Sequence, residues 1–229
     1  MLTWEAIRQV PEGGVYACCD NAQTVEMLQE QALILPQLMQ PIVLTAFNGI
    51  EDLIPQLSPE LKFNCIFGRN FCRNFCRNFS ANSIQLLAPF LESSGRWILA
   101  ETIPQAAQRL YSFLDRSSIS ADLYDRLSNA EESHYQANGA QYLDLGKLSQ
   151  AFVEAGFTIT IEQMISRTEL YISEALYNRW FGPNSTYVQQ LCEYLDQTEI
   201  EIIRQLFLTR LLKQTVTVEG TIAYIIAIK

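Results

Sequence analysis

The amino-acid sequence predicts an α/β fold with a mostly parallel sheet. Short apolar runs alternate with amphipathic stretches along the first half of the chain, which is the pattern of βαβ units with right-handed crossovers. The 229 residues, of which 48% are hydrophobic and 18% charged, are enough to bury one substantial core. We therefore expect a single domain over residues 1 to 229.

Each predicted strand of the first half is recognisable as a short apolar run. The four runs are VYACC (15 to 19), IVLTAF (42 to 47), FNCIF (63 to 67) and RWILAE (96 to 101). Between them, TVEMLQEQALILPQLM is predicted to be helical up to Pro41, GIEDLIPQL to contain a short helix, and SIQLLAPFLESSG to be a helix that ends at Gly95. This order predicts parallel pairing with helices on both faces of the sheet.

The second half is predicted to be mainly helical, with two further strands. PQAAQRLYSFLD and LYDRLSNAEESHYQ are predicted helices, and LGKLSQAFVEAGFTITIEQM joins a helix to a strand through Gly156. Residues 168 to 213 are predicted to form a helical insertion, which has its clearest amphipathic pattern in EIEIIRQLFLTRLL. TVTVEGTIAYIIAIK has the β-branched density of a closing strand.

Composition argues against several classes of protein. The formal net charge of −9 disfavours direct nucleic-acid binding by the domain as a whole, because phosphate contacts need clustered Lys and Arg. The longest apolar runs are far shorter than the roughly 20 residues that span a bilayer, and the N-terminus lacks the pattern of a signal peptide. We expect a cytoplasmic protein without membrane contact, whose six cysteines are reduced thiols.

The stretch FGRNFCRNFCRNF at residues 67 to 79 repeats a four-residue unit. On a helix this period places Phe71, Phe75 and Phe79 on one stripe and three arginines on another. One interpretation is an amphipathic segment with buried Phe and solvated Arg; the other is a positive patch that holds a phosphate or an acidic partner. The cysteines of this region lack the ligand spacing and the nearby His of a zinc site, so no metal is expected.

The polar segment NAEESHYQ contains the only histidine of the chain, His134. We expect His134 to be a solvated surface residue. Glu131 and Glu132 are predicted to form a solvated acidic face, and an acid/base pair is the alternative. The sequence contains no GxSxG nucleophile elbow, which disfavours hydrolase chemistry.

Taken in order, these segments resemble the class I S-adenosylmethionine-dependent methyltransferases, whose fold is Rossmann-like. VYACCDNAQTVEMLQEQA resembles that family's second strand, acidic strand end and next helix, and IVLTAFNGIEDLIPQL its third strand and adenine-flanking loop. FNCIFGRN resembles the fourth strand with its loop, LLAPFLESSGRWILAET the passage into the fifth, and LSQAFVEAGFTIT the sixth. AYIIAIK resembles the seventh, which implies an antiparallel last strand in a methyltransferase-type sheet.

The resemblance implies an S-adenosylmethionine site at the carboxyl ends of three strands, where open α/β sheets bind ligands. It gives Asp20 the role of binding the ribose hydroxyls; capping the following helix is the alternative role. It places the adenine beside residues 47 to 49, and the methyl donor and acceptor at the loop of residues 68 to 70. The implied cofactor-binding residues are Asp20, Asn21, Phe47, Asn48, Gly49, Gly68, Arg69 and Asn70.

The sequence departs from the family at its most specific feature, a first strand followed by a Gly-rich turn. WEAIRQVPE (4 to 12) resembles the helix after such a turn, and Gly13 and Gly14 precede a predicted strand rather than follow one. Either a longer protein supplies this strand, or the lineage has lost it. The first case is compatible with a cofactor site, and the second argues against one.

Four further runs resemble a particular group of fusion proteins. PEGGVYA, LQEQA, FGRN and LAETIPQAAQRLY are similar to the C-terminal region of bacterial proteins that begin with a RarA/MgsA-type AAA+ ATPase, a recombination and replication-maintenance factor. The chain itself has no P-loop motif, GxxxxGK followed by Ser or Thr. We expect a degenerate methyltransferase-like domain that acts as an interaction or regulatory module of such an ATPase. The alternative is an active methyltransferase of unknown acceptor.

Overall fold

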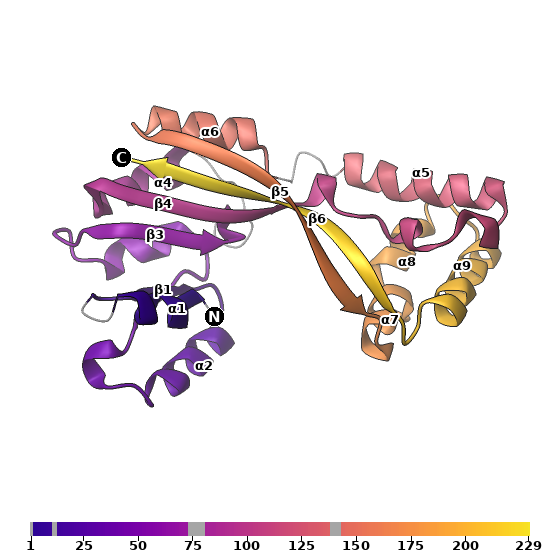
Figure 1. Cartoon of the computed structure of the whole chain (residues 1–229), viewed down its shortest axis with the longest axis horizontal. Helices are drawn as coiled ribbons and strands as arrows, with labels where there is room; N and C mark the ends of the chain where they lie inside the picture. Colours follow the sequence, from indigo (N-terminus) through magenta and orange to yellow (C-terminus); the bar gives the residue numbers. More distant parts are fainter. Residues whose placement is uncertain (1, 11–12, 73–80, 138–142) are drawn as a thin grey trace. The chain divides into compact units, whose positions relative to one another are not determined.

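The computed structural model of the chain describes residues 2–10, 13–72, 81–137 and 143–229. The chain divides into two compact units, each assembled from segments that are distant in sequence (Figure 1). Unit 1 consists of Met1–Glu101, Leu143–Glu162 and Ala223–Lys229, and unit 2 of Thr102–Tyr142 and Gln163–Ile222. That the whole chain folds as one domain stays a prediction.

The strands form a two-stranded and a four-stranded sheet. They are β1 (Tyr16–Cys19), β2 (Ile42–Thr45), β3 (Phe63–Arg69), β4 (Leu91–Ile103), β5 (Thr158–Tyr171) and β6 (Thr215–Ile228). β1 and β2 pair in parallel, and the larger sheet has the order β3-β4-β6-β5, in which β3 and β4 are parallel. All the predicted strands are therefore present, and the predicted parallel pairing is confirmed for these two pairs. The helix predicted to end at Gly95 is wrong in its last part, because β4 already begins at Leu91. The helix predicted up to Pro41 ends at Ala32.

The last strand runs antiparallel to its neighbours, as predicted. The Lys229 N–H, just after β6, donates to the carbonyl of Gly95 in the first half of β4 (3.2 Å). At the other end of β6, the Ile172 N–H donates to the Gln214 carbonyl (2.9 Å), and the Lys213 N–H donates to the Ile172 carbonyl (2.8 Å). These bonds join the end of one strand to the start of the next, which only antiparallel neighbours do.

No described strand lies between β1 and β3, so the predicted single sheet is divided at this point. The carbonyls of Val15 and Cys19 accept hydrogen bonds from the β2 side, at 2.8 and 2.9 Å. Because backbone groups of successive residues point to opposite edges of a strand, those of Tyr16 and Cys18 point away from β2. By the same alternation, every second residue of β3 has its backbone N–H and C=O groups on the side away from β4. Near the start of the two strands, the rings of Tyr16 and Phe63 are in contact, with centroids 5.2 Å apart.

The described helices of unit 1 pack against both of its sheets, the first two beside β1 and β2 and the last two on one face of the larger sheet. They are α1 (Leu2–Gln9), α2 (Ala22–Ala32), α4 (Ala81–Leu87) and α6 (Leu145–Glu154), with the 3-10 segments η1 (Gln37–Met39), η2 (Ile50–Gln56) and η3 (Ala88–Phe90). Trp97 of β4 is fully buried and contacts Phe152 of α6, Phe157 and Phe71, with ring centroids 5.3 to 6.4 Å apart. Edge-to-face rings of this kind contribute beyond the apolar area that they bury.

The opposite face of β3, β4 and the end of β6 has no helix over it in Figure 1, where α4 lies behind the sheet. On β6, Ala223, Ile225 and Ala227 are fully buried, whereas Tyr224, Ile226 and Ile228 are 40 to 43% exposed. The prediction of helices on both faces is therefore wrong for these strands. Strand alternation places apolar residues on both faces, and the helices in the described part of the chain cover only one of them.

Unit 2 is built mainly from helices. They are α5 (Ala121–Ala137), α7 (Glu174–Phe181), α8 (Thr186–Leu191) and α9 (Gln197–Arg210), with the 3-10 segments η4 (Pro104–Ala106), η5 (Leu110–Phe113) and η6 (Arg116–Ser118). Their core centres on Leu127, Ile203 and Phe207, which are fully buried. Each of α7, α8 and α9 begins at a side-chain cap, namely Ser173, Ser185 and Asp196.

Two boundaries of unit 2 differ from the prediction. PQAAQRLYSFLD forms short 3-10 segments instead of an α-helix, because the side chain of Arg109 donates to the carbonyls of Pro104, Gln105 and Ala107 and holds this stretch in turns. Residues 168 to 171, predicted to start the helical insertion, extend β5 and lie beside β6, where Glu169 accepts a hydrogen bond from Thr217. The helices of the insertion start at Glu174 and end at Arg210.

Within the described ranges, no helix has the length and apolar character needed to cross a membrane. Of the repeat at residues 67 to 79, Phe71 and Cys72 are described and buried. Its predicted stripes depend on Phe75, Phe79 and two of the arginines, which lie outside the described residues.

We predict that Phe152→Ala destabilises unit 1 by about 3 to 5 kcal/mol, because it removes a fully buried ring from the cluster around Trp97. Urea denaturation followed by tryptophan fluorescence measures this change. Val153→Ala, on the same helix but 58% exposed, is the matched control and should change stability by less than about 0.5 kcal/mol. Equal midpoints for the two variants would show that the aromatic cluster does not hold the unit together.

Candidate functional site

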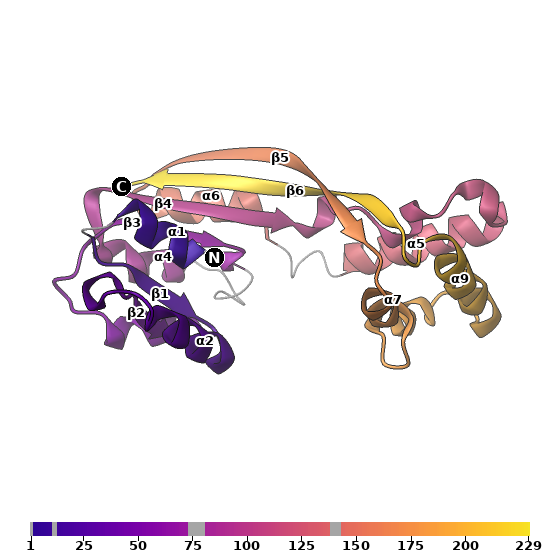
Figure 2. The ribbon, with the colours of Figure 1, turned by 60° about the horizontal axis from the view of Figure 1, so that its bottom comes forward.

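The residues predicted to bind the cofactor all lie in unit 1, at or just after the ends of β1, β2 and β3. In Figure 2 the arrows of β1 and β4 point the same way, and β2 and β3 are parallel to these two strands. Residues 20–21 and 47–49 therefore lie in loops at the carboxyl ends of the strands, as the sequence predicted, and residues 68 and 69 are the last two of β3 itself. The ligand roles of these residues stay predictions.

Asp20 and Asn21 form the first of these loops. Asn21, not Asp20, caps α2: its Oδ1 accepts from the Thr24 backbone N–H at 2.8 Å. The capping role considered for Asp20 is therefore wrong, because the cap lies one residue later. The Asn21 amide donates to Asp20 Oδ1 at 2.7 Å, and among the described residues no donor reaches Asp20 Oδ2. This half-buried carboxylate keeps one oxygen able to accept from a ligand hydroxyl.

The second loop contains Phe47, Asn48 and Gly49. Phe47 is 52% exposed, and Gly49 has φ 140°, which a residue with a side chain rarely adopts. The backbone and side-chain amides of Asn48 donate to Asp52 Oδ2 at 2.9 and 3.2 Å. Sequence reasoning missed Asp52, although an acid in the first turn of a short helix was a signal of such an anchor.

The third group is Gly68, Arg69 and Asn70. Gly68 and Arg69 are the last two residues of β3 and pair with Leu99 and Ala100, so their predicted place in the loop is wrong and only Asn70 lies beyond the strand. A Cβ on Gly68 would lie 3.0 Å from the Cβ of Phe71, so the close approach of Phe71 explains the glycine. Asn70 has φ 52°, and its N–H donates to the Ala100 carbonyl at 2.9 Å. Arg69 is exposed.

Glu101 is a further acid at this end of the sheet that sequence reasoning missed. It is 2% exposed, and its Oε1 accepts from the Cys72 N–H at 3.1 Å. Burial raises the pKa of the Glu101 carboxyl, and the hydrogen bonds from the loop partly oppose this shift. Glu101 ends the apolar run RWILAE, and its position in that run is the only feature of the sequence that indicates a buried acid. Its observed contact fixes the loop after β3.

These residues fit only part of S-adenosylmethionine. Asp20 offers the acceptor that a ribose requires, whereas the backbone N–H of Asn48 and one N–H of its side chain are already bound to Asp52. The part of the cofactor that the family binds on a turn between its first strand and first helix has no counterpart, because no described strand lies between β1 and β3. No methyl-transfer step follows from these residues alone. In the described part of the chain, no three His, Cys, Asp or Glu side chains are grouped as metal ligands.

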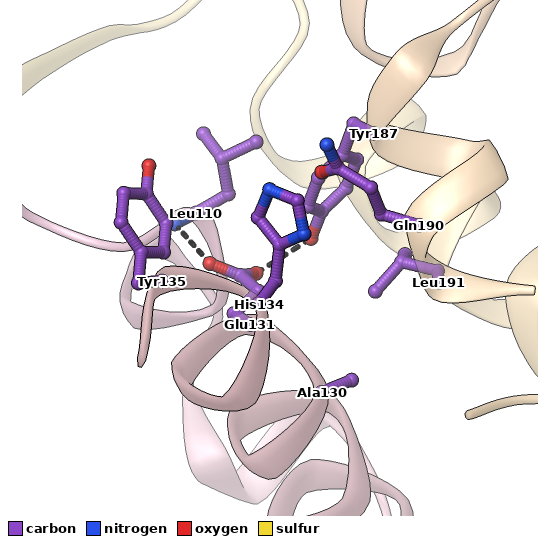
Figure 3. A pocket seen from close by; sticks show the side chains of 8 residues that line it. All are labelled: Leu110, Ala130, Glu131, His134, Tyr135, Tyr187, Gln190 and Leu191. Carbon is purple, nitrogen blue, oxygen red and sulfur yellow. Dashed lines mark hydrogen bonds between the residues drawn. The ribbon is translucent and has the colours of Figure 1, made fainter. Parts of the chain in front are cut away.

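Unit 2 contains a second polar site, centred on Glu131 of α5 (Figure 3). Glu131 is 4% exposed, so the predicted solvated acidic face is wrong for this residue. Its carboxylate accepts from the Tyr187 hydroxyl (2.6 Å) and from the backbone N–H groups of Leu110 and Tyr111 (both 2.9 Å). These donors come from α8 and η5, which the sequence places far from α5. Glu131 therefore joins three elements of unit 2.

A hollow of about 190 Å³ opens beside this carboxylate, lined in part by His134, Tyr135, Tyr187 and Gln190. His134 is half-buried in this wall, so its predicted place on a solvated surface is wrong. The guanidinium of Arg109 lies 3.7 Å from the ring centre of Tyr135. Burial raises the pKa of Glu131 to about 7, and the donors and Arg109 oppose this shift. Because three donors already hold the carboxylate, its geometry is that of a structural anchor.

Solved methyltransferase structures resemble this chain. The plantazolicin methyltransferase BpumL, solved with a pentazolic desmethylPZN analog and SAH, is 13% identical, with a TM-score of 0.44 over 99% of this chain and 71% of its own. The YcgJ protein of Bacillus subtilis is 12% identical, with a TM-score of 0.47 over 94% of this chain and 82% of its own. At these scores the likeness alone does not establish a shared fold. No family model and no curated protein sequence matches the chain.

We predict that the stability of the protein falls by about 2 to 3 kcal/mol between pH 5 and pH 8 through Glu131. The pKa of this residue rises from 4.5 to about 7 on folding, so the folded state binds more protons than the unfolded state in this window. The stabilisation is complete below pH 4.5 and is lost as the pH rises through 7. Urea denaturation at several pH values measures this slope.

Glu131→Gln should remove this part of the slope, because the amide does not titrate. Glu132→Gln is the matched control, since Glu132 is the next residue on the helix and is partly exposed. The same slope in wild type and Glu131→Gln would contradict the assignment of the proton to Glu131.

Proposed function

We propose that this chain is a degenerate methyltransferase-like domain that acts as an interaction or regulatory module. The observation that carries the proposal is the division of unit 1 between β1 and β3. A cofactor site at the carboxyl ends of parallel strands needs a continuous sheet, because the loops must be fixed relative to one another to within a fraction of an ångström. The two sheets of unit 1 do not share a hydrogen-bonded strand.

The division also favours a role in binding polypeptide. β1 and β3 each have an edge whose backbone N–H and C=O groups no described strand pairs. Such edges are sites at which other chains add by main-chain hydrogen bonds. The unpaired edges therefore favour a protein partner over a small-molecule ligand.

We further propose that the partner is a RarA/MgsA-type AAA+ ATPase. The support is the similarity of PEGGVYA, LQEQA, FGRN and LAETIPQAAQRLY to the region that follows the ATPase in bacterial fusion proteins. The chain has no P-loop of its own, so nucleotide hydrolysis would belong to the partner. Regulation of a recombination and replication-maintenance factor is the role that this pairing implies.

The second candidate is an active S-adenosylmethionine-dependent methyltransferase of unknown acceptor. Its support is Asp20 Oδ2, which no donor among the described residues reaches, together with the left-handed Gly49 after β2. In such an enzyme the loop after β3 would hold the acceptor, and catalysis would come mainly from proximity.

Thermal unfolding with S-adenosylmethionine or S-adenosylhomocysteine near millimolar concentration separates the two candidates. We predict an unchanged midpoint, because the described residues supply only part of a site. Ligand at about 100 times its dissociation constant would add roughly 2.7 kcal/mol and raise the midpoint by about 5 to 10 °C. Such a rise, abolished by Asp20→Ala but kept in the exposed α2 variant Glu26→Ala, would establish the enzyme instead.

We also predict that the chain forms a complex with a purified RarA/MgsA-type ATPase. Size-exclusion chromatography with light scattering, at tens of micromolar of each protein, detects a complex by its mass. An unrelated acidic protein of similar size is the control for attraction by net charge alone. Separate elution of the two proteins at low salt would refute the ATPase partnership and leave the cofactor question to the thermal measurement.

A further inference from the structure

The uncovered side of β3, β4 and β6 is an apolar surface bordered by positive charge. Its apolar residues, named here the open face, are Phe67, Ile98, Tyr224, Ile226 and Ile228. Phe67 is 44% exposed, the last three are 40 to 43% exposed, and Ile98 is half-buried. Parallel strands are usually covered on both faces, and exposed apolar patches of this kind mark interaction sites.

These residues share one face because burial alternates along each strand. Trp97 and Leu99 of β4 are fully buried on the helix-covered side, so Ile98 between them points to the other side. The register pairs Phe67 with Ile98, which places the two on the same face. On β6 the fully buried Ile225 leaves its neighbours Tyr224 and Ile226 on that face.

Two arginines stand at opposite ends of the open face. Arg96 pairs in register with Cys65, and the hydrogen bond between Lys229 and Gly95 places Ile228 beside it. Arg69 pairs with Ala100, four residues farther along the sheet, which is a distance of about 13 Å. Both side chains are exposed, and among the described residues neither forms an ion pair.

The charges decide which occupant fits. Two copies of this chain meeting through their open faces would bring four arginines together, and none of the five residues of the open face is an acid that could pair with them; the exposed acids of this side, Glu92 at the start of β4 and Glu162 on β5, lie at its borders. A helix with an apolar stripe fits the patch, and about 13 Å corresponds to eight or nine helical residues. Acidic side chains eight residues apart lie on one side of such a helix and reach both arginines.

We propose that the open face binds an amphipathic helix of a partner protein, with acidic residues at both ends of its apolar stripe. The inference rests on the proposed function as an interaction module, and it adds the chemistry of the partner. The helix would complete the layer that α4 and α6 form on the other side of the sheet.

Fluorescence anisotropy with a labelled synthetic peptide tests this proposal on the full chain. The probe is an 18-residue amphipathic helix with a central Leu stripe and two Glu residues eight positions apart, one at each end of that stripe. Its control has Lys at those two positions. We expect the Glu peptide to bind roughly three- to tenfold more tightly at low salt, because two exposed ion pairs add a modest and screened preference.

Variants of the chain sharpen the result. Arg69→Glu combined with Arg96→Glu should reverse the preference in favour of the Lys peptide, and Ile226→Glu should weaken both peptides by at least roughly tenfold. Leu38→Glu is the matched control, because Leu38 is 96% exposed and lies outside the open face; it should leave binding unchanged. Circular dichroism confirms that each variant is folded.

Three results would overturn the proposal: no binding of either peptide, equal binding of both that charge reversal does not alter, or a wild-type dimer that Ile226→Glu dissociates. The last result, seen by light scattering, would assign the open face to a second copy. A thermal shift with S-adenosylmethionine would refute the degenerate module without bearing on peptide binding, so the two proposals fail separately.

Discussion

The backbone edges of β1 and β3 set the constraint on which the rest of unit 1 depends. Parallel strands bury their polar backbone only when each has a neighbour on both sides, because an unpaired N–H or C=O away from water costs about as much as a lost hydrogen bond. Each of these strands has one described neighbour. The contact of Tyr16 and Phe63 joins the two sheets by side chains alone, without a shared backbone ladder. The candidate cofactor residues therefore belong to two sheets: those after β1 and β2 to the smaller one, and those at the end of β3 to the larger one.

The core of unit 1 lies on one face of the larger sheet, the face that α4 and α6 cover. The rings of Trp97, Phe152 and Phe157 pack together between the sheet and α6. The apolar surface that they bury stabilises this layer. The opposite side keeps apolar residues of the same strands in contact with water. The packed side fixes the shape of the open face that we propose as a binding surface. This arrangement connects the division between β1 and β3, the proposed interaction role and the open face.

In unit 2, the buried carboxylate of Glu131 holds the elements together. Glu131 satisfies two backbone donors of the stretch after β4 and one hydroxyl of α8, so the cost of burying it is offset by three hydrogen bonds. Arg109 lies nearby with Glu132 and the ring of Tyr135. Polar anchoring of this kind fixes how the short 3-10 segments meet the helices, where apolar packing alone would permit several arrangements.

The sequence by itself determined where the strands lie along the chain, because side-chain alternation and apolar runs are local. β1, β2 and β3 overlap the predicted runs, and β4 contains its run but begins five residues earlier, at Leu91. Only the tertiary structure decided that Glu131 is buried, since its partner Tyr187 is 56 residues away. It also decided that Asn21 rather than Asp20 caps α2, and which face of β6 stays open. Burial depends on what other segments cover, and no local pattern contains that information.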